Sequence, residues 1–199
     1  MKLLTSIIAL CLLFFSFQSN AQNYHLDLRL SYSQAGLNGD DPAAISINDR
    51  QSFGIGLVHT IRTYQSKFGF SIETGYILKG TRIENESLDY RLHYINAPIL
   101  LDYYPTQKLK LSIGPELGFL TDARNRINDS TSVSIDDVYD NRWDISGTVS
   151  ISYALDFFLD VGARYNRSFT RFDKMDAVLN RKDQYTDYFQ IFLSFKIAN

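Results

Sequence analysis

The sequence is poor in the residues that build disulfide-bonded and metal-bound cores. Its 199 residues contain one cysteine, one tryptophan, two methionines, three histidines and four prolines. Cys11 lies in an apolar run near the N-terminus, so the rest of the chain can form neither an internal disulfide nor a thiolate metal site. His25, His59 and His93 are scattered over separate segments. We therefore expect no metal site and no cofactor.

Strong charge of either sign is also absent. Twenty Lys and Arg stand against 22 Asp and Glu, a net charge of −2 that is too mild to indicate a nucleic-acid partner. The acidic residues Asp129, Asp136, Asp137 and Asp140 lack the glycine and the terminal glutamate of a calcium loop. They predict a solvated acidic loop.

An export signal is the first feature that is present. Lys2 precedes an apolar run over residues 3–15, and a polar stretch then ends at Ala21. These are the parts of a secretory signal, and the run is short for a membrane helix of about 20 residues. We predict cleavage after Ala21, which leaves residues 22–199 as one domain.

Eight later segments alternate apolar and polar residues with the period of a strand. In the last of them, Phe189, Ile191, Leu193, Phe195 and Ile197 alternate with Gln190, Phe192, Ser194 and Lys196. A segment of this length suits a tilted strand that crosses a bilayer. The eight segments cover residues 24–33, 53–62, 68–78, 90–103, 109–120, 143–153, 157–166 and 189–197.

The connections between these segments alternate between short and long. Short turns are predicted near residues 64–66, 105–107 and 155–156, and long polar connections at 34–52, 79–89, 121–141 and 168–186. This order is typical of outer-membrane barrels with short periplasmic turns. We predict an all-β, eight-stranded, antiparallel up-and-down transmembrane β-barrel in a Gram-negative outer membrane. We expect both termini in the periplasm, and a monomer inserted by barrel-assembly machinery into outer-membrane lipid.

The alternative is a secreted, soluble eight-stranded barrel of the lipocalin type, which alternates in the same way. The composition of the two faces favours the membrane. The apolar face has almost no charge and carries tyrosines near segment ends, whereas the polar face holds small residues and balanced charges. Because buried charge is costly unless compensated, these charges predict an interior salt-bridge network. Its candidate residues are Asp27, Arg29, Glu73, Asp102, Lys110, Glu116, Asp144, Asp160, Arg164 and Lys196.

Two ion pairs follow from the predicted turns. A turn at residues 105–107 sets Asp102 opposite Lys110, and a turn at Leu155 sets Arg164 near Asp144. Solvated charges in a wet lumen are the alternative. Pro98 and Pro115 fall at nearly the same height in this register, so we predict one shared irregularity, a bulge, for both. Leu92 and Tyr94 also differ in parity from Ile95, which indicates either a bulge there or a strand end that stands clear of the membrane.

Two of these segments resemble a known family. Residues 94–103, Tyr-Ile-Asn-Ala-Pro-Ile-Leu-Leu-Asp-Tyr, are similar to the Tyr-x-Glu-Ile-Pro-Leu-Leu-Leu-Lys-Tyr strand of the PorT-like outer-membrane β-barrel domain family. Residues 114–119, Gly-Pro-Glu-Leu-Gly-Phe, resemble its following Gly-Pro-x-x-Gly strand. Asn96 and Asp102 replace the usual Glu and Lys. The resemblance implies an outer-membrane barrel, and its named member serves in protein secretion.

Function is expected at the loops rather than at a catalytic centre. No histidine has the serine and acid that a lipid hydrolase needs, so we predict no enzyme activity. Eight strands leave an interior that side chains fill, which argues against transport. Loops on a rigid scaffold are where binding resides. The third connection offers a candidate surface-binding loop with Arg124, Arg126, Asp129, Asp136, Asp137 and Tyr139. The alternative for this loop is a disordered, linker-like segment. The alternative function for the protein is an accessory role in a secretion or envelope-assembly machine.

Overall fold

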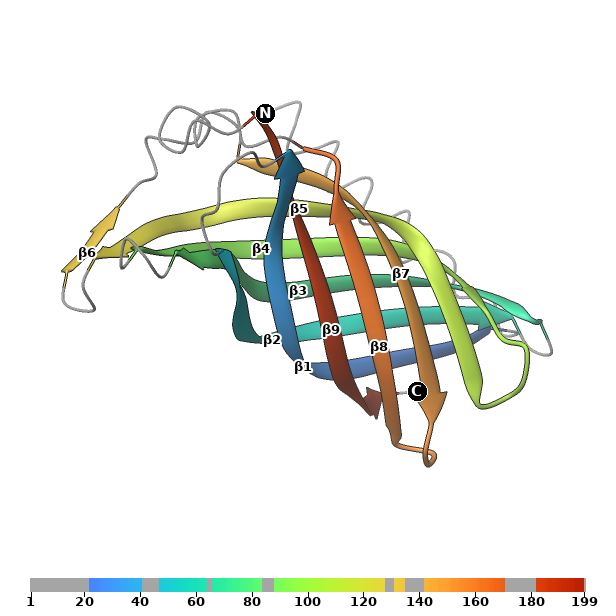
Figure 1. The fold of residues 1–199 in the computed structure, drawn as a ribbon. Coiled ribbons are helices and arrows are strands. Elements are labelled where there is room, and N and C mark those ends of the chain that lie inside the picture. The colour runs from blue at the N-terminus through green and yellow to red at the C-terminus, as the bar shows by residue number, and fades with distance from the viewer. Residues whose placement is uncertain are drawn as a thin grey trace, which may run out of the picture.

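The chain folds into β-strands. The computed structural model describes residues 22–40, 47–63, 66–83, 88–127, 131–134, 142–170 and 182–198 (Figure 1). No helix in these residues is long and apolar enough to cross a membrane. The predicted signal, residues 1–21, lies outside them. The strands are β1 (Gln22–Asp40), β2 (Ile47–Thr63), β3 (Phe68–Ile83), β4 (Leu88–Tyr103), β5 (Leu109–Ile127), β6 (Thr131–Ser134), β7 (Trp143–Ala154), β8 (Leu159–Ser168) and β9 (Lys182–Ala198).

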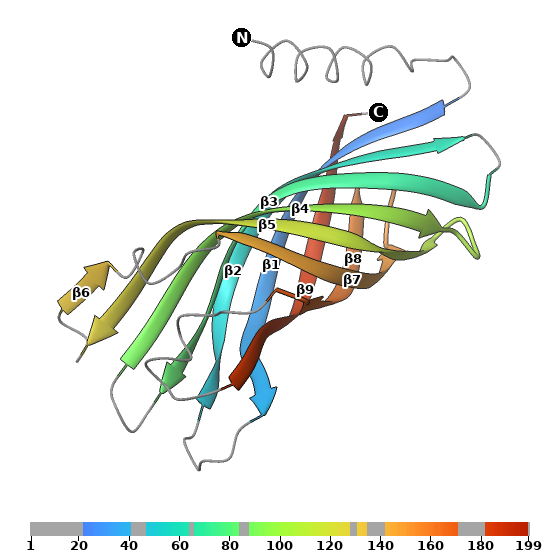
Figure 2. The same cartoon turned by 90° about the horizontal axis from the view of Figure 1, so that it is seen from above.

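Eight of these strands close into a ring. The sheet order is β4-β3-β2-β1-β9-β8-β7-β5-β6, and a β4–β5 pairing closes the barrel. Every pairing is antiparallel, and β1 meets β9 with Tyr32 opposite Ile191. The short strand β6 pairs only with the far end of β5 and stands away from the ring (Figures 1 and 2). The predicted eight-stranded antiparallel barrel is confirmed.

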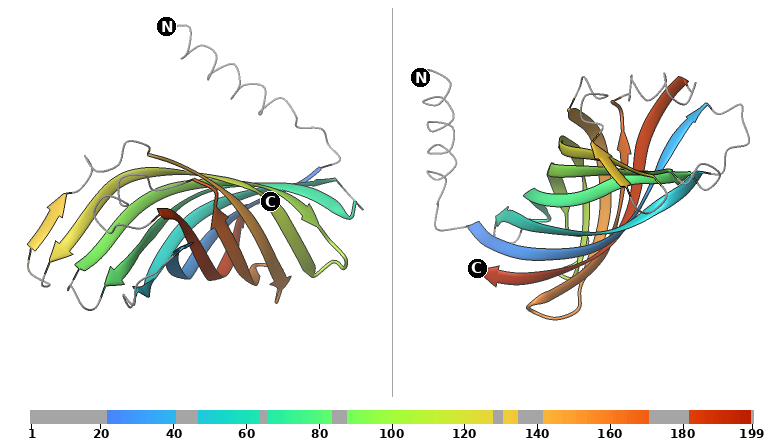
Figure 3. Two further views of the ribbon diagram at one scale, coloured as in Figure 1. Left: turned by 45° about the horizontal axis from the view of Figure 1, so that its top comes forward. Right: turned by 90° about the vertical axis from the view of Figure 1, so that its left-hand side faces the viewer.

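The strands are staggered around the barrel. When the ladder partners are followed from strand to strand once around the ring, the path returns to β1 ten residues further along that strand. The circuit begins at Tyr24 on β1 and returns to β1 at Gln34, a difference of 34 − 24 = 10. It passes through Ile61, Phe70, Leu101, Ile113, Val149, Tyr165 and Phe189. This stagger over eight strands corresponds to a strand tilt of about 40°. Figure 3 shows the strands crossing the barrel obliquely.

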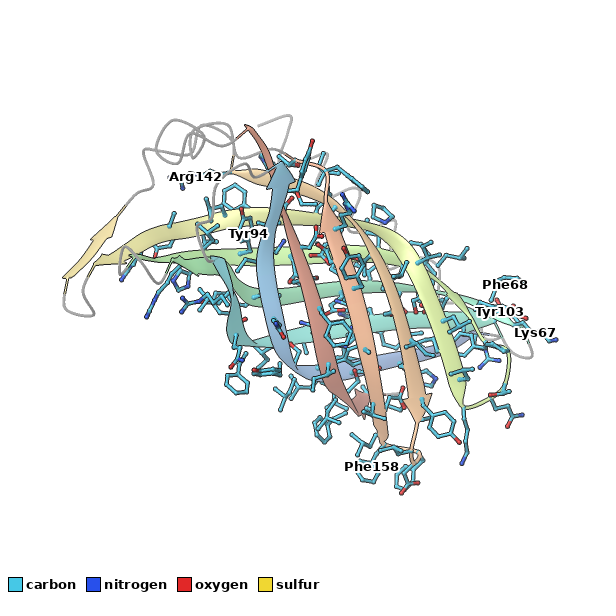
Figure 4. The ribbon with its side chains drawn as sticks, viewed as in Figure 1. Lys67, Phe68, Tyr94, Tyr103, Arg142 and Phe158 are labelled. Carbon is cyan, nitrogen blue, oxygen red and sulfur yellow. The ribbon has the colours of Figure 1, made fainter. Side chains whose placement is uncertain are left out.

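The outer face of the barrel is apolar and is bounded by aromatic residues at both ends. Leu30, Leu101, Ile113, Ile151 and Ile191 are among its exposed large side chains. Aromatic pairs lie across neighbouring strands at both ends, namely Phe68–Tyr103 at one end, and Tyr32–Phe53 and Phe119–Trp143 at the other. Figure 4 shows Phe68, Tyr103 and Phe158 at the end that carries the short turns. We call this the short-turn end and the opposite one the long-loop end. Such a face suits hydrocarbon and not water.

The strands run further toward the long-loop end than their apolar alternation predicts. β1 continues to Asp40 and β5 to Ile127, and β9 begins at Lys182. The predicted connections at 34–52, 79–89, 121–141 and 168–186 are therefore too long. The sequence signal stops early because a strand beyond the lipid keeps its ladder but has no apolar face to maintain.

The two prolines lie next to each other without a bulge. Pro98 is opposite Glu116 and Pro115 is opposite Gly147, and the β4–β5 register is unchanged on both sides of them. The shared bulge predicted there is wrong, because a gap in the ladder is enough to accommodate two residues without N–H groups. The irregularity predicted in β4 is wrong: Leu92 and Tyr94 point inward with the same parity as Asn96 and Asp102, and the register shift at His93 and Tyr94 comes from an extra residue in β5, Thr121.

Candidate functional site

The centre of the lumen holds a carboxylate between two arginines. Glu73 Oε2 accepts hydrogen bonds from Arg29 Nη1 and Arg164 Nη2, both at 2.6 Å. The three residues come from β3, β1 and β8, and all point inward because they share the polar parity of their strands. The Phe192 ring lies 4.0 Å from the Arg29 guanidinium. This charged cluster joins three strands across the barrel.

A second buried carboxylate is held by neutral donors. Glu116 is 0% exposed and accepts hydrogen bonds from Tyr188 Oη at 2.7 Å, Thr148 Oγ1 at 3.0 Å and Asn96 Nδ2 at 3.3 Å. None of the described cations forms an ion pair with it. Asn166 donates from Nδ2 to Thr148 and Ser146, which extends the network along β7 and β8.

A third cluster lies toward the long-loop end. Lys79 Nζ donates to Asp144 Oδ2 at 2.8 Å, and Ser168 donates to the other oxygen of Asp144. The Lys79 ammonium also lies 4.8 Å from the ring centre of Tyr94 and 5.2 Å from that of Tyr188. Lys79 is 0% exposed, so the carboxylate and the two rings replace its hydration.

The short-turn end of the lumen holds acidic and basic side chains in equal number. Asp27 is opposite Lys196 in the β1–β9 ladder, Lys196 Nζ lies 3.5 Å from Asp160, and Asp102 accepts a hydrogen bond from Ser71. Lys110 is half-buried opposite Ser152. Below them, the Arg62 guanidinium covers the Tyr104 ring at 4.0 Å, and burial raises the pKa of Tyr104 above its usual range.

All ten candidate interior residues are buried or half-buried, but their pairings differ from the two ion pairs that we predicted. Asp102 is opposite Ser112 rather than Lys110, and Arg164 is opposite Ser150 and binds Glu73 rather than Asp144. Both predicted pairs are wrong. A register error of an even number of residues keeps every side chain on its face and changes all of its partners.

The lumen becomes apolar at the long-loop end. Ala35, Ile77, Leu92, Leu120 and Ala123 point inward and are at most 2% exposed. Ile77 precedes Lys79 on β3, and Leu92 lies opposite Lys79 in the β3–β4 ladder, so this apolar layer lies beside the Lys79–Asp144 pair as well as beyond it. The sequence analysis missed this layer, and it also missed Lys79 and Tyr188. Lys79 continues the inward parity of Glu73, Gly75 and Ile77, so a longer β3 would have revealed it.

Polar residues continue along the outer face beyond the aromatic ring. His93 Nδ1 shares a hydrogen bond with Tyr76 Oη, its Nε2 lies 3.9 Å from Asp122, and Arg124 Nε lies 2.6 Å from Asp122. At the other end, His59 shares a 2.7 Å hydrogen bond with Tyr24 Oη. Within the described part of the chain, no group of three or more His, Cys, Asp or Glu side chains is arranged to hold a metal ion.

The candidate surface-binding loop is only partly described. Arg124 is exposed on β5, and Arg126 belongs to the same strand. Part of the predicted loop is β6, which pairs with β5 from Arg124 to Ile127. Asp129, Asp136, Asp137 and Tyr139 lie outside the described residues.

Comparison with known proteins agrees with this architecture. Residues 18–174 match the family described as the outer membrane protein beta-barrel domain. The chain belongs to this family. It is therefore an outer-membrane β-barrel, and its apolar outer face lies in a lipid environment. The soluble lipocalin-like alternative is set aside by the same match. The comparison with curated proteins gave no match.

The fold is similar to that of small solved barrels. The attachment invasion locus protein Ail of Yersinia pestis is 10% identical, with a TM-score of 0.53 over 90% of this chain and 100% of Ail. Ail was also solved in complex with the heparin analogue sucrose octasulfate. Neisserial surface protein A is 15% identical, with a TM-score of 0.51 over 88% of this chain and 99% of that protein. At these identities the likeness shows the fold alone.

Proposed function

We propose that this protein is a non-enzymatic, monomeric outer-membrane barrel that presents its long-loop end at the cell surface for interaction or envelope integrity. The observation that carries the proposal is the difference between the lumen and the long-loop end. Side chains of three charged clusters and an apolar layer fill the lumen, whereas strands β1 to β6 extend past the apolar outer face at the long-loop end. The strand extensions at this end are thus available for contacts outside the membrane, whereas the filled lumen does not conduct solutes. Both termini and the short turns lie in the periplasm, after removal of residues 1–21.

Single-cysteine labelling tests the orientation. The mature chain has no cysteine, so Ser132→Cys on β6 and Gln107→Cys in the β4–β5 turn each introduce one thiol. A membrane-impermeant maleimide should label Ser132→Cys in intact cells and Gln107→Cys only after permeabilisation. The reverse pattern would show that the barrel is inverted.

Deletion of residues 128–141 tests the surface role. The ring can close without this segment, because β5 pairs directly with β7 from Leu109 to Phe119, although residues 121–127 must then leave the β4–β5 ladder to reach Arg142, which lies next to Leu120. The variant should keep heat-modifiable gel mobility, a sign of a folded barrel, and lose adhesion or binding at the cell surface. Binding that survives the deletion would remove this loop as the site.

A second candidate function is an accessory role in a secretion or envelope-assembly machine, as the PorT-like motif of β4 and β5 suggests. It is favoured by the β7–β8 turn, where Phe157 is 82% exposed and Leu155 is 54% exposed. The turn that carries Lys108 is polar by comparison, with Thr106 and Gln107 also exposed. A photo-crosslinker at position 157 should give defined protein adducts if the barrel is an accessory. Adducts with lipid alone would support the surface role.

A further inference from the structure

The middle of β4 is paired with its two neighbours less completely than the rest of that strand. β4 lies between β3 and β5 (Figure 1). The β3–β4 ladder omits Ala97 and Pro98, and the β4–β5 ladder omits Ile99 and Leu100. The register is the same before and after each gap, so the strand is continuous and the pairing alone is interrupted. The β8–β9 ladder, by contrast, runs without a gap.

Pro98 causes the first gap. Tyr104 N–H donates to Lys67 O, which directly precedes β3. The backbone N–H groups of a strand point alternately to its two neighbours, so the even-numbered residues of β4 direct their nitrogens toward β3. In this register Pro98 faces Glu73. Because proline has no N–H, the backbone carbonyl of Glu73 loses its ladder donor.

Pro115 causes the second gap. Leu120 N–H donates to Arg142 O, away from β4, so the odd-numbered residues of β5 before it direct their nitrogens toward β4. Pro115 faces Ile99 in this register, and the carbonyl of Ile99 also loses its donor. This carbonyl lies against Gly114, where a Cβ atom would overlap its oxygen. The displaced carbonyl therefore requires glycine at position 114.

Both gaps lie in the middle of the lipid-facing band. The exposed large apolar side chains of β4 run from Ile95 to Tyr103, and Pro98 and Ile99 are halfway between them. Hydrocarbon offers no water that could replace a missing ladder bond at this depth. Local separation of the strands here breaks fewer hydrogen bonds than separation of a continuous ladder.

Buried carboxylates flank Pro98 on both sides. In the register of the two ladders, Pro98 lies between Glu73 on β3 and Glu116 on β5. Arg29 and Arg164 tie the Glu73 carboxylate to β1 and β8. The hydrogen bonds of Glu116 reach β4, β7 and β9. Two clusters of the lumen thus meet in the row where the ladder is interrupted.

We propose that residues 97–100 of β4 are an opening point built into the barrel wall, and that the Glu73 and Glu116 clusters are braces that keep it closed. On opening, these residues move away from β3 and β5 while both ends of β4 stay paired. One brace holds β3 to β1 and β8, and the other holds β5 to β4, β7 and β9. Surface display needs only a rigid barrel, so it leaves Pro98 and the Gly114–Pro115 pair unexplained. The opening point gives these residues a role.

Amide hydrogen exchange tests the opening. The mature barrel is placed in lipid nanodiscs, and the exchange of single amides is followed by NMR. An amide inside the band exchanges when the wall opens locally. The amides of Glu73 and Ile99 should exchange about tenfold faster than those of Ala163 and Ile191, which lie opposite each other in the continuous β8–β9 ladder. Equal protection of the two pairs would overturn the proposal.

Restoring the two donors should close the opening point. In Pro98→Ala with Pro115→Ala, the new N–H groups can bond to the carbonyls of Glu73 and Ile99. Exchange of these two amides should then slow about tenfold relative to Ala163, the factor that corresponds to one backbone hydrogen bond of about 1.4 kcal/mol. The relative rate cancels the effect of proline on the unfolded chain. An unchanged relative rate would show that the prolines do not create an opening point.

Gly114→Ala provides a second, independent check. Alone, its methyl group overlaps the oxygen of Ile99, so the folded fraction in heat-modifiable gels should fall. With Pro115→Ala the carbonyl of Ile99 can return to the ladder, and Gly114→Ala should be tolerated. An equal loss in both backgrounds would contradict the displacement of this carbonyl by Pro115.

Charge variants test the braces. Glu73→Gln should speed the exchange of Ile99, and by a smaller factor when Pro98→Ala restores the ladder. Asp144→Asn is the matched control, because it breaks the buried ion pair with Lys79 toward the long-loop end. This control should leave the exchange of Ile99 unchanged.

Arg164→Met gives the same test at a lower cost in stability, because the Glu73–Arg29 pair remains. Heat-modifiable mobility checks that each variant folds. An effect on the exchange of Ile99 that is the same with and without Pro98→Ala, or that equals the effect of Asp144→Asn, would overturn the assignment of the cluster as a brace. The cluster would then stabilise the barrel as a whole.

Discussion

Glu73 and Glu116 are both buried in the same lumen, but they are neutralised by different kinds of neighbour. Glu73 shares one oxygen between two arginine side chains, whereas Glu116 is surrounded by a tyrosine, a threonine and an asparagine. In the first cluster each charge depends on the others for its compensation. In the second, hydroxyl and amide groups can reorient around a change. Although Glu73 and Glu116 are similarly buried, we therefore expect a substitution at Glu73 to lower the stability of the barrel more than one at Glu116.

The largest expected effect is at Glu73. Glu73→Gln leaves Arg29 and Arg164 buried without a counter-charge, and loss of one member of a buried ion pair costs about 3–5 kcal/mol. Urea unfolding of the barrel in lipid vesicles, followed by tryptophan fluorescence, measures the free energy of unfolding. A loss no greater than that of Glu116→Gln would contradict the comparison.

Removal of one arginine should cost less. Arg164→Met keeps the Glu73–Arg29 pair and removes two buried donors, Arg164 Nε and Nη1, that have no hydrogen-bond partner in the described part of the chain. We expect a loss of about 1–2 kcal/mol in the same unfolding assay. Arg29→Met, which also removes the hydrogen bond to Ser194, is the matched variant and should be at least as destabilising. A loss for Arg164→Met equal to that of Glu73→Gln would show that the two arginines are not redundant.

Glu116→Gln should have a small effect. The amide keeps the shape of the side chain, and the hydroxyls of Tyr188 and Thr148 can turn to accept as well as donate. We expect a change of at most about 1 kcal/mol. Tyr188→Phe is the companion variant, since it removes the shortest bond to the carboxylate. A strongly destabilised Glu116→Gln would mean that the negative charge itself is required.

The smallest effect is expected outside the lumen, at His93. Burial lowers the pKa of His93, and the nearby Asp122 raises it in part. Because the folded barrel then binds fewer protons than the unfolded chain, stability should decrease as the pH falls through the pKa of His93. Asp122→Asn should lower that pKa further. Ring resonances followed by NMR in micelles measure it, and an upward shift in Asp122→Asn would contradict the assigned contact.

The face of the barrel to which each side chain points could be predicted from the sequence, but its height along the barrel axis could not. Alternation assigned Arg29, Glu73, Glu116 and Arg164 to the inner face, because side chains on a strand change face at every residue. The partners of Asp102 and Arg164 depend on turn geometry, and a register shift of an even number of residues leaves no trace in the alternating pattern. The apolar layer at Leu92 and Leu120 was hidden for a related reason. At the long-loop end the inward-facing residues are apolar, so the sequence alone cannot distinguish them from the outward-facing apolar residues.

The heights of the outward-facing aromatic residues show the same limit. Trp143 and Phe169 appear in the sequence as ordinary members of an apolar face. Their height becomes visible only when the stagger of the closed ring is counted from strand to strand.

The β1–β9 ladder, which joins the first and last strands of the ring, also constrains the order of events during biogenesis. Tyr32 and Ile191 are separated by almost the whole mature chain, so this contact has the greatest loop-closure entropy of any in the barrel. Until β9 has left the secretion channel, β1 carries a row of unpaired N–H and C=O groups that hydrocarbon cannot satisfy. Insertion must therefore wait until β9 has been exported, or another protein must hold the edge of β1 in the meantime.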